Sequence, residues 1–201
     1  MPAHRPSVLA AALLAAAAAT GAAQSPSPPA PASRAVAVLA GGCYWGVESV
    51  FRHVRGVTSA TSGYALPAGG LLSRRAEAVR IVYDPSRLSY QQILDVFFSV
   101  VHDPTQLDRQ GPDVGEEYRS VVFADGGGER RVVRAVVDSL TAAHAFPRPI
   151  VTEIDALRAF QVVGPDQQDY AARHPTDPYI VVNDVPKIEA LRRRFPRLYR
   201  D

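Results

Sequence analysis

Cys43 is the only cysteine in this chain of 201 residues, so no internal disulfide bond can hold the fold together. Stability must therefore come from an apolar core. Apolar residues make up 47% of the sequence, and the length suits one well-packed domain rather than two large ones. We expect one domain whose lone thiol is retained for chemistry. The alternative is a structural cysteine buried in that core, which is the commoner fate of a single cysteine.

The first 33 residues have the layout of an export signal followed by a tether. His4 and Arg5 precede an apolar run over 8–19, and small residues follow, so we predict a cleavable signal peptide over 1–23. Residues 24–33 are rich in Ser, Pro and Ala and predict a linker to a domain over 34–201. The apolar run is too short for a comfortable membrane span. We expect an exported protein, periplasmic or secreted, without stable membrane insertion.

The charge pattern gives no sign of a nucleic-acid partner. The formal net charge is only +2. The basic run Arg192-Arg193-Arg194 lies within 185–198, a segment with the pattern of a surface helix, so a solvated helix face is expected there.

Apolar periodicity predicts the order of strands and helices. Residues 35–40 read as a buried strand, and the apolar spacing over 47–54 marks one face of a helix that Gly56 ends. Ser89 and Gln92 form a capping box before a second helix. Further strands are expected at 57–64, 76–83, 118–124 and 150–154, and a further helix after Gly128. The order through 124 predicts a two-layer α+β sandwich with a ferredoxin-like βαββαβ core, which residues 160–201 wrap as irregular chain and helices.

The position of Cys43 favours a reactive thiol. It stands in Gly41-Gly42-Cys43-Tyr44-Trp45-Gly46, between the first strand and the first helix. Backbone N–H groups and the helix dipole at such a position favour the thiolate. Tyr44 and Trp45 offer a small apolar receptor beside it.

Glu77 is a candidate proton donor. Alternation in the strand 76–83 places it on the same face as apolar neighbours, where desolvation favours the protonated acid. The alternative is a carboxylate that reaches water at the strand end or pairs with Arg74 or Arg75.

Three further polar residues matter only jointly. Tyr64 ends the second strand, and Tyr118 follows the polar stretch 102–117, which also contains Asp113. Taken singly, strand tyrosines contribute packing area and loop aspartates cap turns.

Together these residues resemble the A-type peptide methionine sulfoxide reductases. Gly42-Cys43-Tyr44-Trp45-Gly46-Val47-Glu48 is similar to the family's Gly-Cys-Phe-Trp-Gly motif, Gly63-Tyr64 to its Gly-Tyr strand end, and Ala76-Glu77-Ala78-Val79 to the strand with its catalytic glutamate. Other similar segments are His102-Asp103-Pro104, Gln110-Gly111, Asp113, Gly115, Tyr118-Arg119-Ser120, Thr152-Glu153-Ile154 and Gln168-Asp169-Tyr170. The resemblance extends over 36–179.

The resemblance implies reduction of methionine S-sulfoxide, in proteins or peptides and in free form, to methionine. Cys43 would attack the sulfoxide sulfur and be left as a sulfenic acid, while Glu77 protonates the oxygen. The implied substrate-binding residues are Tyr44 and Trp45 around the S-methyl group, Tyr64 and Tyr118 at the oxygen, and Asp113 through an ordered water or by orienting polar partners.

This sequence departs from the family pattern in four places. Tyr44 stands where Phe is usual, Arg74-Arg75 replace Gly-His, and Glu117 replaces Gln. The fourth departure is the absence of any resolving cysteine. An external thiol must therefore reduce the sulfenic acid, either a thioredoxin-like or glutaredoxin-like protein or a small thiol. We expect a monomer with no bound cofactor.

Two other classes of function fit the sequence less well. A cysteine hydrolase would pair Cys43 with a histidine base, but no histidine has a local hydrolase signature. An exported binding protein would recognise oxidised methionine without turnover, but the presence of both Cys43 and Glu77 favours an enzyme. One cysteine and scattered histidines offer no ligands at metal spacing, so no metal site is predicted.

Overall fold

The structure is a computed structural model that describes Met1 and residues 34–69 and 74–201. Apart from Met1, the expected signal peptide (1–23) and linker (24–33) lie outside the described residues, as do residues 70–73 of the loop after the second strand. From residue 34 onward the chain forms an α+β domain, as predicted.

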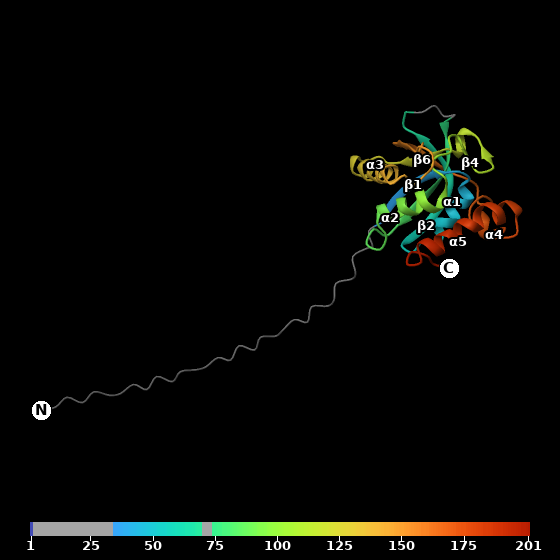
Figure 1. Ribbon diagram of the computed structural model, residues 1–201. Helices are drawn as coiled ribbons and strands as arrows, with labels where there is room; N and C mark the ends of the chain where they lie inside the picture. Colours follow the sequence, from blue (N-terminus) through green and yellow to red (C-terminus); the bar gives the residue numbers. More distant parts are fainter. Residues whose placement is uncertain (2–33, 70–73) are drawn as a thin grey trace. The chain divides into compact units, whose positions relative to one another are not determined.

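A six-stranded sheet forms the centre of this domain, in the order β7-β6-β1-β3-β2-β8 (Figure 1). Neighbouring strands are antiparallel, except for the parallel pair β6 and β7. The strands are β1 (Ala35–Gly41), β2 (Val57–Pro67), β3 (Ala76–Tyr83), β6 (Ser120–Phe123), β7 (Glu153–Asp155) and β8 (Leu157–Val162).

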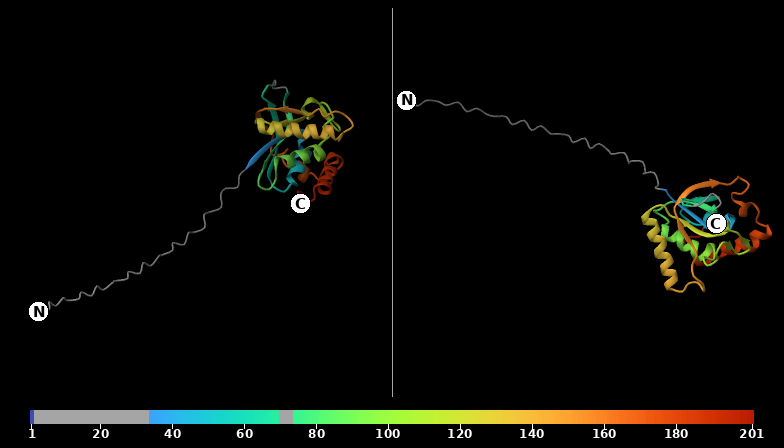
Figure 2. Two further views of the ribbon diagram at one scale, coloured as in Figure 1. Left: turned by 60° about the vertical axis from the view of Figure 1, so that its left-hand side comes forward. Right: turned by 90° about the horizontal axis from the view of Figure 1, so that it is seen from above.

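Helices cover one face of the sheet, where most of the apolar core lies (Figures 1 and 2). They are α1 (Tyr44–Arg52), α2 (Tyr90–Val96), which continues as the π-helical turn η2 (Phe97–Val101), and α3 (Gly127–Ala142). The predicted capping box is present, since the Gln92 N–H donates to the Ser89 hydroxyl and the Ser89 N–H donates to Gln92 Oε1. This cap fixes the start of α2.

The other face of the sheet carries a smaller core with several alanines, which the curled edge of the sheet at β8 covers. Ala65, Ala76 and Ala78 are fully buried there, against Phe160 of β8. The curl arises because β2 pairs with β3 along most of its length and with β8 over its last part. The expectation of irregular chain from residue 160 is therefore wrong as far as Val162. This edge strand is half exposed, so it lacks the apolar alternation that marks a strand.

The C-terminal segment wraps around α1, as expected. It contains α4 (Tyr170–Arg173), the π-helical turn η4 (Ile180–Asp184) and α5 (Val185–Arg194). The Arg55 N–H donates to the Leu198 carbonyl at 2.6 Å, and the Arg200 N–H donates to the His53 carbonyl at 2.9 Å. These bonds hold the segment at the C-terminal end of α1.

The polar stretch 102–117 is more structured than its sequence suggests. It contains a short hairpin, β4 (Arg109–Gln110) and β5 (Asp113–Val114), followed by the 3-10 turn η3 (Glu116–Tyr118). The strand predicted over 118–124 consequently begins only at Ser120. Tyr118 therefore belongs to the turn and not to the strand.

Candidate active site

Cys43 lies at the junction of β1 and α1, where two glycines turn the chain. Gly42 has a φ of +91°, and a Cβ on it would lie 2.6 Å from the Gln110 side chain. Only glycine fits such a position without strain. Cys43 itself is the N-cap of α1 and is 9% exposed. The thiol is thus nearly buried at the start of the helix.

Glu77 supplies the helix cap that Cys43 does not. The Cys43 side chain makes no capping hydrogen bond, whereas the Tyr44 N–H donates to Glu77 Oε2 at 3.1 Å. The Glu77 residue is 7% exposed. Burial raises the pKa of its carboxyl to about 7, with Asp113 and Glu117 adding to the rise and the Tyr44 N–H opposing it. This agrees with the desolvated acid that the strand pattern predicts, and the group is part protonated at neutral pH.

The expectation that the helix start favours the thiolate of Cys43 is wrong for this fold. Burial, together with the charges of Glu77 and Asp184, raises the pKa of the thiol to about 12. The Trp45 N–H and the Tyr179 hydroxyl lower the pKa, but less. Partial charges at a helix end are outweighed by desolvation and two carboxyl groups. Cys43 is therefore a neutral thiol at rest.

Aromatic rings surround the thiol end of α1. Tyr44 meets Tyr64 edge to face at 6.1 Å between ring centres, and its hydroxyl donates to Gln167 Oε1 at 3.3 Å. The hydroxyl that distinguishes this residue from phenylalanine thus has a partner. Trp45 stacks on Tyr170 at 3.8 Å and meets Tyr179 edge to face at 5.9 Å. Together these rings form an apolar wall beside Cys43.

Tyr64 and Tyr118 approach Glu77 from two different elements. Tyr64 of β2 is paired in register with Glu77 of β3. Burial raises the pKa of the Tyr118 hydroxyl to about 12, and the charges of Glu77, Asp113 and Cys43 contribute to the rise. The predicted residues are therefore gathered around one carboxyl group and one thiol.

Tyr179 is a site residue that the sequence alone did not reveal. Its hydroxyl donates a short hydrogen bond to Asp113 Oδ2 and also interacts with the Cys43 thiol. Burial and the neighbouring Cys43 raise the pKa of this hydroxyl. It joins the β4–β5 hairpin to the C-terminal segment across 66 positions of sequence. No local motif marks such a contact.

Residues 35–198 match the family model described as peptide methionine sulfoxide reductase. The chain belongs to this family. A curated relative, peptide methionine sulfoxide reductase MsrA 2 of Mesorhizobium japonicum, is 45% identical over 172 residues, which cover 81% of this chain and 88% of the relative. MsrA of Natronomonas pharaonis is 42% identical over 173 residues, covering 80% and 95%.

Solved structures of the family share the fold of this reductase. Reduced Mxr1 of Saccharomyces cerevisiae superposes with a TM-score of 0.63 at 25% identity, covering 73% of this chain and 89% of that one. Methionine sulfoxide reductase A of Corynebacterium diphtheriae gives a TM-score of 0.60 at 27% identity, covering 73% and 77%.

The reductase converts methionine S-sulfoxide to methionine by attack of Cys43 on the sulfoxide sulfur, which leaves a sulfenic acid on Cys43. Because the sequence has no second cysteine, an external thiol reduces this sulfenic acid. The protein is a one-cysteine member of the A type.

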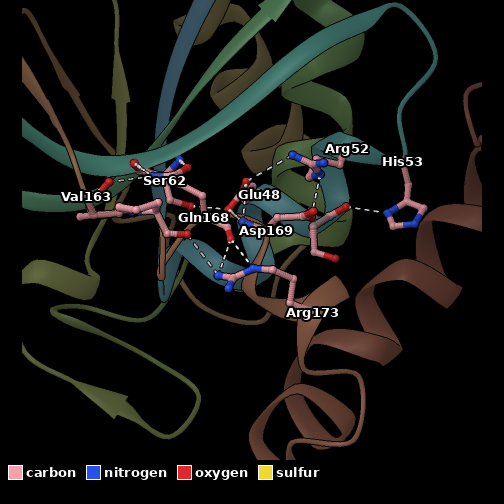
Figure 3. Close-up of polar contacts among 10 residues, drawn as sticks. Glu48, Arg52, His53, Ser62, Val163, Gln168, Asp169 and Arg173 are labelled. Atoms are coloured by element: carbon pink, nitrogen blue, oxygen red, sulfur yellow. Dashed lines mark hydrogen bonds and ion pairs between the residues drawn. The ribbon is translucent and has the colours of Figure 1, made fainter.

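The buried carboxyl group of Glu48 binds the C-terminal segment to α1 and β2 (Figure 3). Glu48 of α1 is 2% exposed and accepts hydrogen bonds from the Ser62 hydroxyl at 2.7 Å and the Asp169 N–H at 3.0 Å. Gln168 bonds the backbone of Ser62 through both its oxygen and its nitrogen. These contacts fix the chain just before Tyr170, and so hold the ring that stacks on Trp45.

The two arginines before β3 do not pair with Glu77. Arg74 forms ion pairs with Glu116 at 2.8 Å and with Glu153 at 3.0 Å. The Arg75 guanidinium lies 4.2 Å above the ring of Tyr64. Arg75 therefore borders the substrate side of the reductase, while Arg74 ties β3 to β7 and η3.

The hydrolase alternative finds no support in the geometry. Within residues 34–69 and 74–201 no histidine hydrogen-bonds to Cys43. The half-buried His102 ring hydrogen-bonds to the Phe97 carbonyl and the Ser120 hydroxyl, and desolvation lowers its pKa to about 4. Its ring is engaged in the core rather than at the thiol.

The described residues offer neither a metal site nor a membrane-spanning helix. No three His, Cys, Asp or Glu side chains among them are placed to hold a metal ion. None of the helices in this part of the chain has the length and apolar character needed to cross a membrane.

Proposed function

We propose that Cys43 carries out the reduction as the nucleophile, and that Glu77 gives one proton to the substrate and takes one from Cys43. The observation that carries the proposal is the contrast between the two groups. Cys43 is held as a neutral thiol, while the nearby Glu77 carboxyl has a pKa raised to about 7. Near neutrality Glu77 can therefore both give and take a proton, which suits a general acid and base.

The proposed reaction transfers the sulfoxide oxygen to Cys43. Protonated Glu77 gives its proton to the sulfoxide oxygen, and the Cys43 sulfur attacks the sulfoxide sulfur as its own proton passes to the Glu77 carboxylate. The attack forms a bond between the Cys43 sulfur and the methionine sulfur. The S–O bond and the new S–S bond on the methionine sulfur then break as the oxygen bonds to the Cys43 sulfur, and methionine leaves. Methionine sulfur gains two electrons and Cys43 loses two, which gives the sulfenic acid.

The surrounding side chains fit the substrate roles that the family resemblance implies. We assign the sulfoxide oxygen to the hydroxyls of Tyr64 and Tyr118, which lie beside Glu77. The S-methyl group is assigned to the rings of Tyr44 and Trp45, since flat apolar surfaces contact soft sulfur and carbon favourably. Asp113 acts through the hydroxyl of Tyr179, which it orients.

We further propose that the reductant is a protein thiol of the thioredoxin type. Mxr1 of Saccharomyces cerevisiae has been solved in complex with Trx2, which supports a partner of this kind within the fold family. A glutaredoxin-like protein and a small thiol are the alternatives. The proposed substrates are oxidised proteins and peptides as well as free methionine sulfoxide, and the proposed active form is a monomer.

We also propose that the protein is exported to the periplasm or the medium, which the predicted signal over 1–23 supports.

For the fold, we propose a two-layer sandwich with a ferredoxin-like core. The order β6-β1-β3-β2, with every neighbour antiparallel, supports this description.

The proposed chemistry is tested by turnover of an N-acetylated methionine sulfoxide peptide with dithiothreitol as reductant. We expect methionine release by the wild type and none by Cys43→Ser, because a hydroxyl is a poor nucleophile toward sulfur at neutral pH. Full activity of Cys43→Ser would refute the mechanism. Replacing dithiothreitol with thioredoxin, glutaredoxin or glutathione then ranks the reductants, and slower turnover with thioredoxin than with the others would refute that choice.

A further inference from the structure

Asp184 is a buried carboxyl group to which the reaction above gives no role. It is the last residue of η4 and is 1% exposed. Its Oδ1 accepts a hydrogen bond from Lys187 Nζ at 3.1 Å, while its buried Oδ2 has no hydrogen-bond partner among the described residues. A buried carboxylate oxygen without a partner lowers the stability of a fold.

The partner of Asp184 is unusual for this chain. Lys187 is the only lysine in the sequence, and the other side chains that are fully cationic at neutral pH are arginines. The ammonium group is a compact point charge, whereas a guanidinium is a broad planar fork. A buried ion pair of this kind does not by itself add stability, since apolar residues of similar volume often serve as well.

The pair is packed against the turn of α1 that follows the nucleophile. A Cβ on Gly46 would lie 2.2 Å from Asp184 Oδ1 and 2.6 Å from Lys187 Nζ. Gly46 is three residues beyond Cys43, so its lack of a side chain lets both charges approach the first turn of the helix. The close approach explains why glycine is needed at this position.

Several titratable groups face Cys43 from the elements packed around it. They are Glu77 of β3, Asp184 of η4, Tyr179 before η4, Tyr118 of η3 and Tyr44 of α1. Asp184 is faced in turn by Lys187 and Asp113. Only Glu77 and Asp184 are carboxyl groups that act directly on the thiol, and they come from different elements of the fold.

We propose that Asp184, held against the first turn of α1 by Lys187, is a positioning group for Cys43 and opposes ionisation of the thiol until methionine sulfoxide enters the site. Reactivity toward oxidants and alkylating agents follows the thiolate, so Asp184 confines reaction of Cys43 to its substrate. This protection matters for a chain with one cysteine, because no second thiol within it can trap the Cys43 sulfenic acid as a disulfide before further oxidation. The inference rests on Cys43 as the nucleophile of the proposed function.

The test is the rate of alkylation of Cys43 by iodoacetamide as a function of pH, followed by mass spectrometry. Since Cys43 is the only cysteine, the signal reports this thiol alone. Asp184→Asn removes the negative charge and keeps the shape, so we expect a lower alkylation midpoint and faster reaction at fixed pH, by about tenfold for each pKa unit. Lys187→Met removes the positive charge and should shift the midpoint upward.

Opposite shifts distinguish this proposal from a structural role. If the pair only supports packing, both variants loosen the site and expose the thiol, and their alkylation curves move in the same direction. That result, or an unchanged midpoint in both variants, would overturn the proposal. Lys187→Arg should keep the wild-type midpoint, and so should Glu189→Gln, a charge loss at an exposed position of α5. If Asp184→Asn does not fold, Lys187→Met against Lys187→Arg still decides the outcome.

The alkylation test uses no methionine sulfoxide. A failure of the proposal therefore appears as a wrong pH profile in an active enzyme. A failure of the proposed function appears as a lack of methionine release, whatever the alkylation profile.

Discussion

The backbone N–H of Tyr44 donates a hydrogen bond to the carboxyl of Glu77, so the acid on β3 caps the helix that begins with the nucleophile. One hydrogen bond thereby sets the position of Glu77 relative to Cys43. It also lowers the pKa of the carboxyl, which burial has raised. Position and proton affinity of the acid are thus linked through the same contact.

We predict that Glu77→Gln slows oxygen transfer more than substrate binding. The amide oxygen can still accept the Tyr44 N–H, but the amide cannot deliver a proton. Loss of general acid catalysis corresponds to about a 10²–10⁴-fold lower single-turnover rate, measured as methionine formed without reductant. Glu129→Gln, at an exposed position of α3, should leave the rate unchanged. An unaltered rate in Glu77→Gln would remove this residue from its proposed role.

The same carboxyl should make stability depend on pH. Because the pKa of Glu77 is raised from 4.5 to about 7 in the folded state, the protonated form favours folding. Its contribution is present below about pH 4.5 and is lost as the pH rises through about 7. Relative to Glu77→Gln, the wild type should therefore lose on the order of 3 kcal/mol over this window. Urea titrations of both proteins across the window measure the difference, and parallel curves would contradict the shift.

Tyr179→Phe should impair catalysis without unfolding the protein. The change removes the hydroxyl that bonds Asp113 beside Cys43 and keeps the ring against Trp45. A hydrogen bond to a charged group is worth about 1.5–3 kcal/mol, which corresponds to roughly a 10- to 150-fold lower kcat/KM if it is strongest in the transition state. Tyr90→Phe is the matched control, because that buried hydroxyl has no hydrogen-bond partner among the described residues. Equal kinetics for the two variants would argue against a role for Tyr179.

Glu48→Gln should weaken the attachment of the C-terminal segment. The amide nitrogen must replace one carboxylate oxygen, and both oxygens accept from the Asp169 N–H, so a donor would face a donor and we expect about 1–3 kcal/mol lower stability. A lower kcat should accompany this loss, because the segment carries the ring that stacks on Trp45. Arg52→Met removes the 3.6 Å ion pair to Glu48 and the 2.9 Å ion pair to Asp169, both made by an exposed arginine, and should cost only about 0–1 kcal/mol. Thermal unfolding and steady-state kinetics compare the two.

Gly42→Ala should displace the thiol. The φ of +91° and the 2.6 Å approach to Gln110 leave no room for a methyl group. We expect a destabilisation of about 1–3 kcal/mol together with a loss of activity. Gly69→Ala is the matched control, since no atom of residues 34–69 or 74–201 lies within 4 Å of a Cβ at that position. Activity in Gly42→Ala equal to that of the control would show that the conformation at the β1–α1 junction is not critical.

Local sequence predicted the parts of the site that depend on local structure. The strand before Cys43, the helix after it and the buried face of Glu77 follow from periodicity over a few residues. The capping box at Ser89 follows from a four-residue pattern and is present. The edge strand β8 could not be predicted in this way, because a half-exposed strand carries a weak apolar signal.

The parts that depend on distant segments were missed or wrong. Asp184, Tyr179 and the Glu48 network reach the site only through tertiary contacts. The ionisation of Cys43 was wrong for the same reason, because the helix start is local whereas burial and the two carboxyl groups are properties of the whole fold. Local sequence therefore identified the reacting groups but not the protonation state of the thiol.

The return of the C-terminal segment to α1 has a consequence for biosynthesis. The segment from Gln167 to Arg200 brings Tyr170, Tyr179 and Asp184 to Cys43, about 125 to 140 residues after the thiol has been synthesised. At translation speeds of roughly 5–20 residues per second, the thiol waits several seconds or longer before this part of its pocket exists. During that interval the fold does not yet shield Cys43 from oxidants.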